Sequence, residues 1–370
     1  MKKILFLIHD LGQGGAEKVL VNLVNNMDLS KFDITVMALF AGGVNEQFLN
    51  KNIKYKYCFK KTFRANSQIL KLFSRKFLFK RFVKEHYDII VSYLEGPTAR
   101  IVSGCDDKDT KLVSWIHIQQ ETEKVASRSF RSYKEAKECY SRYDKIICVS
   151  EYVKQDFQKL FDINIPVDVL YNTNETRQII DKSSEPVEQG LFKDDEIKIC
   201  VVGKVSKRKG CDRVVRIQKQ LISDGLKTHI YFLGVGSDEV FVRNYAKDNN
   251  IENSITLFGY QTNPYKYLSK CDLFICASLA EGFSTAATEA LILGVPVVTV
   301  DVSGMKEMLG ENNEYGIVTE NREEALYAGI KKILTTPNLL EHYAQKANER
   351  GKDFSTEKTV KVVEDMLLSL

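Results

Sequence analysis

Apolar and polar positions alternate along this chain in blocks that predict strands and helices in turn. Near the N-terminus, the apolar strand pattern of residues 3–8 precedes a glycine-rich turn at 12–15 and a helix at 16–24 with helically spaced apolar positions. The pattern returns in the second half, where the apolar run 197–202 leads into a basic loop at 203–210 and another helix start. Strands that alternate with helices form mostly parallel sheets, with ligands at the carboxyl ends of the strands. The sequence therefore predicts an α/β protein.

The length of the chain predicts two domains. A chain of 370 residues is too long for one ordinary hydrophobic core. We expect a first domain at 1–172, a polar linker at 173–196 and a second domain at 197–354. The last segment, 355–370, has the pattern of an amphipathic helix that could cross back onto the first domain.

The stretch 281–289 is the most informative, because it places the start of a helix between two glutamates. Ser284 is a favourable N-cap for a helix that follows the apolar run 273–276 and stops at Gly294. A helix start leaves backbone N–H groups unpaired, and with the helix dipole these groups form an anion site. Gly282 would let a phosphate approach closely, and the N–H groups belong to Phe283, Ser284 and Thr285.

The two acids have separate roles in this interpretation. Glu281 precedes the helix and can accept hydrogen bonds from sugar hydroxyls beside the phosphate. Glu289 lies about two turns further along and suits a second group, such as a ribose. The alternative for this stretch alone is a capped surface helix with two solvated glutamates.

The basic loop at 203–210 offers cations to the same phosphates. Lys204 and Lys209 follow a buried strand, and a charge in a low-dielectric cleft needs either solvent or an anion. A further apolar run, 230–233, leads into a glycine turn that ends at Gly236. Taken alone, the basic loop is more typical of a solvated surface loop than of a phosphate site.

Residues 195–320 resemble the nucleotide-sugar domain of retaining GT-B glycosyltransferases of family 4. The resemblance rests on the order and spacing of short motifs: Gly203-Lys204, Lys209-Gly210, Gly234-Val235-Gly236, Cys271-Asp272-Leu273-Phe274, the stretch 281–289, Gly294-Val295-Pro296 and Gly316-Ile317-Val318. It implies two Rossmann-like domains whose parallel sheets face each other across a cleft. Family members often carry Arg where this chain has Lys204, and a lysine lacks the bidentate fork of a guanidinium, so Lys209 is the stronger candidate for a phosphate ligand.

The resemblance also implies roles for individual residues. Glu281 would bind hydroxyls of the donor sugar and Glu289 the ribose, while Lys204, Lys209 and the amides of Gly282 and Phe283 would bind the diphosphate. In the first domain, Gly14 and Gly15 resemble the acceptor-side loop of polysaccharide-building members, and His117 matches a histidine that contacts the donor sugar. We therefore expect His117, Glu281 and Lys209 to be catalytic and Gly236, Ser284 and Thr285 to help bind substrate.

Two assignments in the first domain have open alternatives. A lone histidine such as His117 is otherwise a hydrogen-bonded core or loop residue. Glu95 ends another candidate strand and is either an acceptor contact or a solvated loop acid. The turn at 12–15 does not match the dinucleotide fingerprint and no Walker loop is present, which argues against an NAD-dependent enzyme or a P-loop nucleotidase.

The implied activity is transfer of a hexose or an N-acetylhexosamine from a nucleotide-diphosphate sugar, UDP-linked by preference, to a membrane-associated glycan. The resemblance implies front-face attack with retention. No Asp-x-Asp lies near a strand end and no cysteines show zinc spacing, so we expect neither metal nor cofactor. The alternatives are a sugar-nucleotide epimerase on the same scaffold and a non-catalytic sugar- or lipid-binding subunit.

Charge and cysteines bear on location. The eight cysteines are scattered, which indicates a reducing compartment, and no signal peptide or bilayer-spanning run is evident, so we expect the protein in the cytoplasm. Between Lys51 and His86 there are twelve Lys or Arg residues and one acid, interleaved with phenylalanines. This basic segment predicts attachment to the inner face of the membrane. A solvated basic face is the alternative, and nothing identifies a nucleic-acid module.

Overall fold

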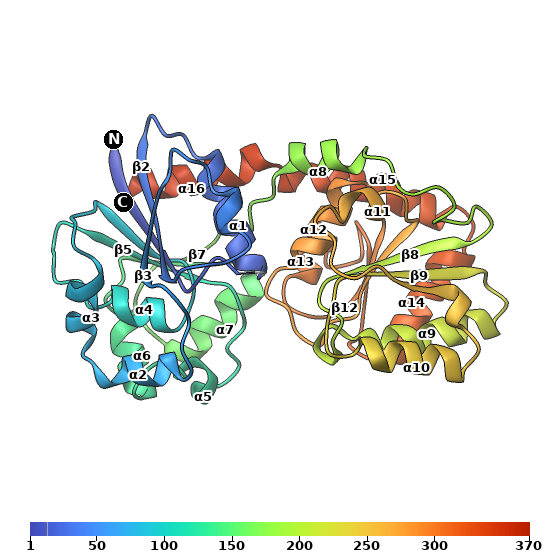
Figure 1. Ribbon diagram of the computed structural model, residues 1–370, viewed down its shortest axis with the longest axis horizontal. Coiled ribbons are helices and arrows are strands. Elements are labelled where there is room, and N and C mark those ends of the chain that lie inside the picture. Colours follow the sequence, from blue (N-terminus) through green and yellow to red (C-terminus); the bar gives the residue numbers. More distant parts are fainter. Residues whose placement is uncertain (13) are drawn as a thin grey trace. The chain divides into compact units, whose positions relative to one another are not determined.

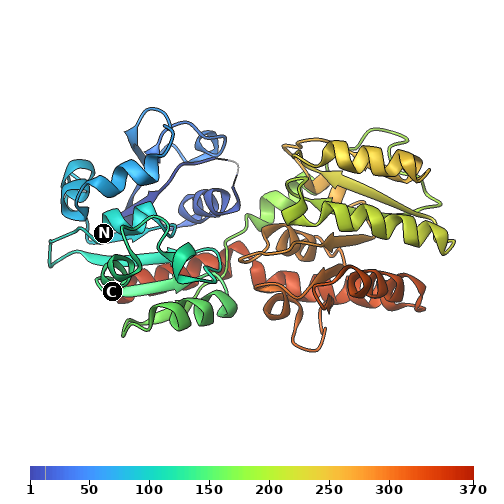
Figure 2. The same cartoon turned by 90° about the horizontal axis from the view of Figure 1, so that it is seen from below.

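The chain forms two compact units (Figure 1) in a computed structural model that describes residues 1–12 and 14–370; Gln13 of the expected glycine turn lies outside them. Unit 1 comprises Met1–Asn174 and Thr356–Leu370, and unit 2 comprises Glu175–Ser355. Each unit is built on one parallel sheet with helices on both faces (Figures 1 and 2). The predicted α/β fold with two Rossmann-like domains is confirmed.

Unit 1 contains a seven-stranded sheet in the order β3-β2-β1-β4-β5-β6-β7. Its strands are β1 (Lys2–Ile8), β2 (Phe32–Phe40), β3 (Lys54–Phe59), β4 (Ile89–Ser92), β5 (Lys111–Ile116), β6 (Lys145–Cys148) and β7 (Val167–Val169). Its helices are α1 (Gly15–Asn26), η1 (Glu46–Phe48), α2 (Asn66–Leu72), α3 (Arg75–Phe82), α4 (Pro97–Val102), α5 (Glu123–Ala126), α6 (Tyr133–Tyr140), α7 (Glu151–Phe161) and α16 (Thr356–Ser369).

The strands at the centre of this sheet are continuous apolar runs because helices cover both faces. The strand order reverses between β1 and β4, so their carboxyl ends bound the crevice at which doubly wound sheets bind ligands. The C-terminal helix α16 completes the unit: its Glu364 accepts a hydrogen bond of 2.6 Å from the backbone of Asp28, and the Lys2 ammonium donates to the carbonyl of Leu367.

Unit 2 contains a six-stranded sheet in the order β10-β9-β8-β11-β12-β13. Its strands are β8 (Ile197–Val202), β9 (Thr228–Leu233), β10 (Ile255–Leu257), β11 (Leu273–Cys276), β12 (Val297–Val300) and β13 (Ile317–Thr319). Its helices are α8 (Thr176–Ser183), η2 (Lys207–Lys209), α9 (Cys211–Ser223), α10 (Glu239–Asp248), η3 (Glu252–Ser254), α11 (Tyr265–Leu268), α12 (Thr285–Ile292), α13 (Met305–Leu309), α14 (Glu323–Thr335), α15 (Leu339–Gly351) and η4 (Lys352–Phe354).

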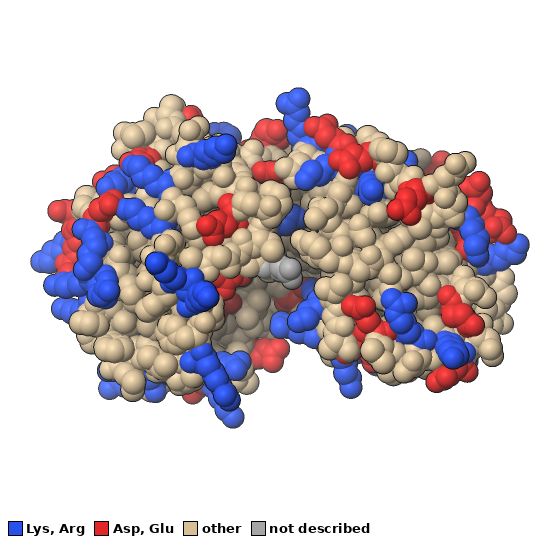
Figure 3. Space-filling view, in the orientation of Figure 1, with Lys and Arg blue, Asp and Glu red and all other residues tan. Residues whose placement is uncertain are grey.

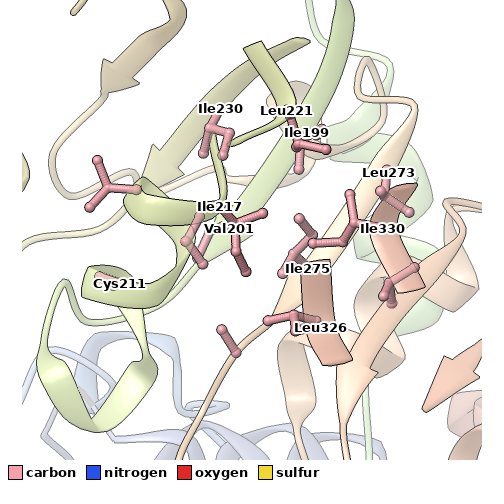
Figure 4. Packing of buried hydrophobic residues seen from close by; sticks show 14 of the residues in the cluster. Ile199, Val201, Cys211, Ile217, Leu221, Ile230, Leu273, Ile275, Leu326 and Ile330 are labelled. Carbon is pink, nitrogen blue, oxygen red and sulfur yellow. The ribbon is translucent and has the colours of Figure 1, made fainter. Parts of the chain in front are cut away.

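The main core of unit 2 lies between its sheet and the helices α9 and α14 (Figure 4). Branched aliphatic side chains from β8 and β11, such as Ile199 and Ile275, meet Ile217 of α9 and Ile330 of α14. Helices α8, α11, α12 and α15 cover the opposite face. This packing fixes the ends of β8 and β11, from which the candidate site loops leave.

The segment 173–196, expected to be a polar linker, contains the helix α8. Its pattern is amphipathic: Ile179 is buried, whereas Ile180 is half-exposed. The helix packs on α11 and α12, and its Lys182 carbonyl accepts a hydrogen bond from the Asn263 amide. One buried apolar residue is enough to dock this short helix on unit 2. The assignment of 173–196 to a linker is therefore wrong for the residues of α8.

No helix within the described residues is both long enough and apolar enough to span a bilayer.

The core in Figure 4 predicts a measurable cost for truncating Ile275, which is fully buried. We expect Ile275→Ala to lower the free energy of unfolding of unit 2 by about 2–4 kcal/mol, through lost apolar burial and the cavity left behind. Urea unfolding followed by circular dichroism measures this. The control Val240→Ala, at a position that is 67% exposed, should change the midpoint little. Equal midpoints for the two variants would contradict the packing described.

Candidate active site

The strand order of unit 2 reverses between β8 and β11, which brings two loops together at the carboxyl edge of the sheet. The loop after β8 carries Lys209, and the loop after β11 carries Glu281. Their side chains form an ion pair, with Lys209 Nζ 2.6 Å from Glu281 Oε1. A backbone hydrogen bond of 2.8 Å from Leu279 N to Arg208 O also joins the loops. The structure thus unites two residues that the sequence separates by more than seventy positions.

One oxygen of the Glu281 carboxylate is held by several donors. Oε1 accepts from Lys209 and from Ser278 Oγ, each at 2.6 Å, and Cys276 Sγ lies 3.9 Å away. Burial raises the pKa of the Cys276 thiol, and the charge of Glu281 raises it further, so the thiol is a neutral donor. Among the described residues, none donates a hydrogen bond to Oε2. The carboxylate is therefore oriented through one oxygen while the other can accept from a ligand.

The helix α12 begins beside this carboxylate as the sequence predicts. Ser284 caps the helix, and its hydroxyl accepts from Ala287 N at 3.3 Å. The preceding turn is braced from the loop after β12, because Ser303 Oγ donates to Gly282 O at 2.8 Å. A Cβ on Gly304 would lie 2.8 Å from the ring of Phe283, so this contact has no room for a side chain. The loop after β12 thus fixes the position of the predicted anion site, which Gly282, Phe283, Ser284 and Thr285 surround.

Glu289 lies on the second turn of α12 and is only 3% exposed. The Tyr265 hydroxyl donates to its Oε1 at 3.2 Å. A buried carboxylate requires hydrogen-bond donors around it, and Tyr265 supplies one of them. The structure thus places Glu289 in the helix that follows the Glu281 turn, where its side chain is buried.

Glycines allow the loops at this edge to pack closely. Gly210 has φ +69°, and a Cβ there would lie 2.0 Å from the carbonyl oxygen of Ala277. A Cβ on Gly236 would lie 2.0 Å from the carbonyl oxygen of Val205, and the Gly236 amide donates to Glu239. Close packing against Val205 therefore explains the glycine at position 236 without the predicted substrate contact. Lys204 is exposed and forms no ion pair with any described residue.

In unit 1, His117 follows β5 and Glu95 follows β4, at the carboxyl edge of that sheet. The backbone N–H of His117 donates to Glu95 Oε2 at 3.0 Å. The imidazole is buried, with the ring of Tyr93 at a centroid distance of 4.8 Å, and its Nε2 has no hydrogen-bond partner among the described residues. Burial lowers the pKa of His117 to about 3, so the ring is neutral at physiological pH.

Glu95 and the glycine turn belong to the same edge of unit 1. Burial raises the pKa of Glu95 to about 7, against the lowering effect of its hydrogen bond from His117, and the charge of Glu17 adds to the rise. Gly14 caps α1, and a Cβ there would lie 1.9 Å from Glu17 Oε2. Gly15 begins the same helix. Gly14 and Gly15 follow β1 and Glu95 follows β4, and these two strands are neighbours in the sheet.

Several residues at these edges were not assigned a role from the sequence: Ser278, Ser303, Gly304 and Tyr265 in unit 2, and His9, Asp10 and Glu17 in unit 1. His9 Nδ1 lies 2.7 Å from Asp10 Oδ2, and this contact lowers the pKa of Asp10. Burial raises the pKa of Glu17. Asp10 follows β1 and Ser278 follows β11, and both strands border the point where the strand order reverses. Their position after these strands is the sequence signal that could have identified them.

The expected catalytic residues are divided between the units: His117 lies in unit 1, and Glu281 and Lys209 lie in unit 2. Within residues 1–12 and 14–370, no group of three or more His, Cys, Asp or Glu side chains is arranged to hold a metal ion.

The chain matches the models of two protein families, which together span most of it. "Glycosyl transferases group 1" matches residues 183–350, and "Glycosyltransferase Family 4" matches residues 13–177.

Two curated proteins are similar over nearly their whole length. An N-acetylgalactosamine-N,N'-diacetylbacillosaminyl-diphospho-undecaprenol 4-alpha-N-acetylgalactosaminyltransferase of Campylobacter jejuni is 28% identical over 386 residues, covering 99% of each chain. An uncharacterized glycosyltransferase of Haemophilus influenzae is 23% identical, covering 97% of this chain and 98% of the relative.

Solved structures share the fold. Anabaena HepE in complex with UDP has a TM-score of 0.79 at 17% identity, covering 100% of both chains. TarM has a TM-score of 0.76 at 14% identity, covering 99% of this chain and 98% of that one.

The raised pKa of Glu95 predicts a pH-dependent cost of its charge. The folded pKa of about 7 lies above the usual 4.5, so the folded state holds the proton more tightly, and stability is lost as pH rises from 4.5 to 7. As pH rises over this range, the free energy of unfolding of Glu95→Gln should increase relative to that of the wild type by about 1–2 kcal/mol. Unfolding by urea at several pH values measures the difference. The lowered pKa of His117 makes stability rise with pH, but it does so equally in the wild type and the variant and cancels in their difference. A difference in unfolding free energy that does not change with pH would contradict the raised pKa of Glu95.

Proposed function

The chain belongs to the GT-B glycosyltransferases of family 4, and from this we propose that it moves a hexose or an N-acetylhexosamine from a UDP-linked sugar to a hydroxyl of a lipid-linked glycan, with retention. The observation that carries the proposal is the Lys209–Glu281 pair beside the start of α12. A cation and helix amides suit a diphosphate, and a carboxylate with one open oxygen suits sugar hydroxyls. The three features lie together at the strand reversal of unit 2.

Lys209 can hold Glu281 and a phosphate at the same time. Its ammonium has three N–H bonds and gives one to Glu281, which leaves two for phosphate oxygens. The exposed Lys204 is a second cation for the diphosphate. Glu281 Oε2 accepts from the sugar, and Glu289, held through Tyr265, is our candidate for the ribose.

Leaving-group chemistry explains why these groups would accelerate transfer. As the bond between the anomeric carbon and the phosphate oxygen breaks, negative charge grows on the diphosphate, and donors that bind this charge more tightly lower the barrier. We propose that the acceptor hydroxyl attacks from the same face and that its proton passes to the departing phosphate oxygen. This path requires no carboxylate nucleophile and no metal ion.

Unit 1 offers groups that suit a hydroxyl-rich ligand. The partnerless Nε2 of the neutral His117 can exchange a hydrogen bond with a sugar hydroxyl, and Glu95, Glu17 and Asp10 supply acceptors. The name of the Campylobacter relative describes a diphospho-undecaprenol-linked acceptor and an N-acetylgalactosaminyl group. It supports a lipid-linked glycan as the acceptor here, and we propose that transfer takes place at the cytoplasmic face of the membrane.

The two members of the ion pair should have separable effects. We expect Lys209→Ala to weaken UDP binding about tenfold or more, because a charged hydrogen bond to phosphate is lost. Glu281→Gln should leave UDP affinity nearly unchanged but lower transfer about a hundredfold, because it removes a ligand of the sugar. Calorimetric titration with UDP, and transfer from radiolabelled UDP-sugars to a bacterial lipid extract, measure the two effects.

The matched control for this pair is Lys219→Ala, an exposed lysine in the last part of α9, which should change neither quantity. Unchanged UDP binding by Lys209→Ala would contradict the proposal.

Metal independence follows from the assignment of the diphosphate to lysines. We expect transfer to persist in excess EDTA and to be unaffected by added Mg²⁺, because protein cations balance the leaving charge. If chelation abolishes transfer and Mg²⁺ restores it, the diphosphate is held through a metal ion and the role given to Lys209 is wrong.

A further inference from the structure

Apolar side chains are exposed together where α2 meets α3 in unit 1. We name this set the apolar corner, and its members are Ile69 (41% exposed), Leu72 (76%), Phe73 (44%) and Phe77 (52%). The rings of Phe73 and Phe77 stack on each other, with a centroid distance of 5.4 Å and an interplanar angle of 19°. A contiguous exposed apolar patch with a polar rim is typical of a binding surface.

Two arginines hold the backbone of the apolar corner in place. Arg100, only 2% exposed, donates to the carbonyl oxygens of Leu70 and Phe73 at 3.1 and 2.9 Å and pairs with Glu135 at 3.0 Å. Arg131 donates to the carbonyls of Lys71 and Leu72. These bonds satisfy the carbonyl groups at the end of α2. The apolar side chains are thus presented by a fixed backbone.

The cations of the basic segment divide into paired and unpaired groups. On β3, Lys54 pairs with Asp33 and Lys56 with Glu85, which neutralises them. On α2 and α3, by contrast, Lys71 and Lys76 form no ion pair with any described residue. Figure 3 shows Lys and Arg side chains gathered over the left side of unit 1, where α3 lies in Figure 1. On α3, Lys80 pairs with Asp106 at 3.1 Å. Lys71 and Lys76 thus place unpaired charge on the two helices that form the apolar corner.

A basic groove adjoins α3. Its lining residues are Arg75, Tyr133, Lys134, Lys137, Glu138, Ser141 and Arg142, of which four are cationic and one is acidic. Arg75 begins α3, between Phe73 and Phe77 of the apolar corner, and Lys134 and Lys137 belong to α6. Exposed apolar side chains beside cations match the two layers of a membrane surface, acyl chains and anionic headgroups.

We propose that the apolar corner inserts into the interface of an anionic phospholipid bilayer, with Lys71, Lys76 and the cations of the basic groove against lipid phosphates. This inference rests on the proposed function, since a lipid-linked acceptor requires the enzyme to reach a membrane. Phe73 and Phe77 already stack face to face, which argues against the alternative that they stack on nucleic-acid bases. The complementarity of unpaired lysines to anionic headgroups selects a bilayer as the occupant.

Flotation with phosphatidylcholine vesicles, with and without phosphatidylglycerol, tests this on the full-length protein. We expect binding only with phosphatidylglycerol, and a partition coefficient at least about tenfold lower for Leu72→Gln/Phe77→Gln and for Lys71→Gln/Lys76→Gln. The control Val240→Gln/Phe241→Gln changes exposed apolar residues of α10 in unit 2 and should bind like the wild type.

Thermal stabilisation by UDP tests whether the donor site of each variant is intact. It should equal that of the wild type, because none of the substituted residues belongs to the proposed donor site. Absence of UDP stabilisation in the wild type would overturn the proposed function, whereas the vesicle result would still stand. Undiminished vesicle binding by the lysine variant, binding without anionic lipid, or retention of single-stranded RNA in place of vesicles would overturn the inference. The lysine variant decides the question if the Leu72/Phe77 variant does not fold.

Discussion

The ion pair between Lys209 and Glu281 is the interaction on which the candidate site of unit 2 depends. It joins the loops after β8 and β11 at the point where the strand order reverses, and Ser278 fixes the same carboxylate oxygen. Each charge offsets the cost of placing the other in a partly buried loop. A phosphate that binds Lys209 would add a second anion beside a carboxylate that is already oriented, which suits a ligand with both phosphate and hydroxyl groups.

Unit 1 has the opposite electrostatic character at the corresponding edge of its sheet. Burial keeps His117 neutral and raises the pKa of Glu95 to about 7, so little fixed positive charge is present to hold a phosphate. Hydroxyl groups can be bound there through hydrogen bonds with less cost in desolvated charge. The same sheet topology thus supports two kinds of binding chemistry, and the residues that follow the strands decide between them.

Much of this arrangement could be predicted from the sequence, because local patterns determine it. The apolar runs before Lys204 and Glu281 and the N-cap Ser284 predicted strands, loops and a helix start, and these elements form as expected. The hydrogen bonds of Ser278, Ser303 and Tyr265 could not be predicted, because each joins segments whose proximity depends on strand order. The helix α8 was missed because a single well-buried residue, Ile179, docks an otherwise polar segment.

The basic segment shows the same limit of sequence patterns. Its composition indicated a charged surface, but only the structure separates the lysines that pair with Asp33 and Glu85 from those of α2 and α3 that form no ion pair. The most direct measurement of the central claim is a crystal structure with a bound UDP-sugar. The account predicts the diphosphate between Lys209 and the start of α12, with a sugar hydroxyl on Glu281 Oε2. A UDP-sugar bound at the other edge of the sheet, remote from both residues, would contradict it.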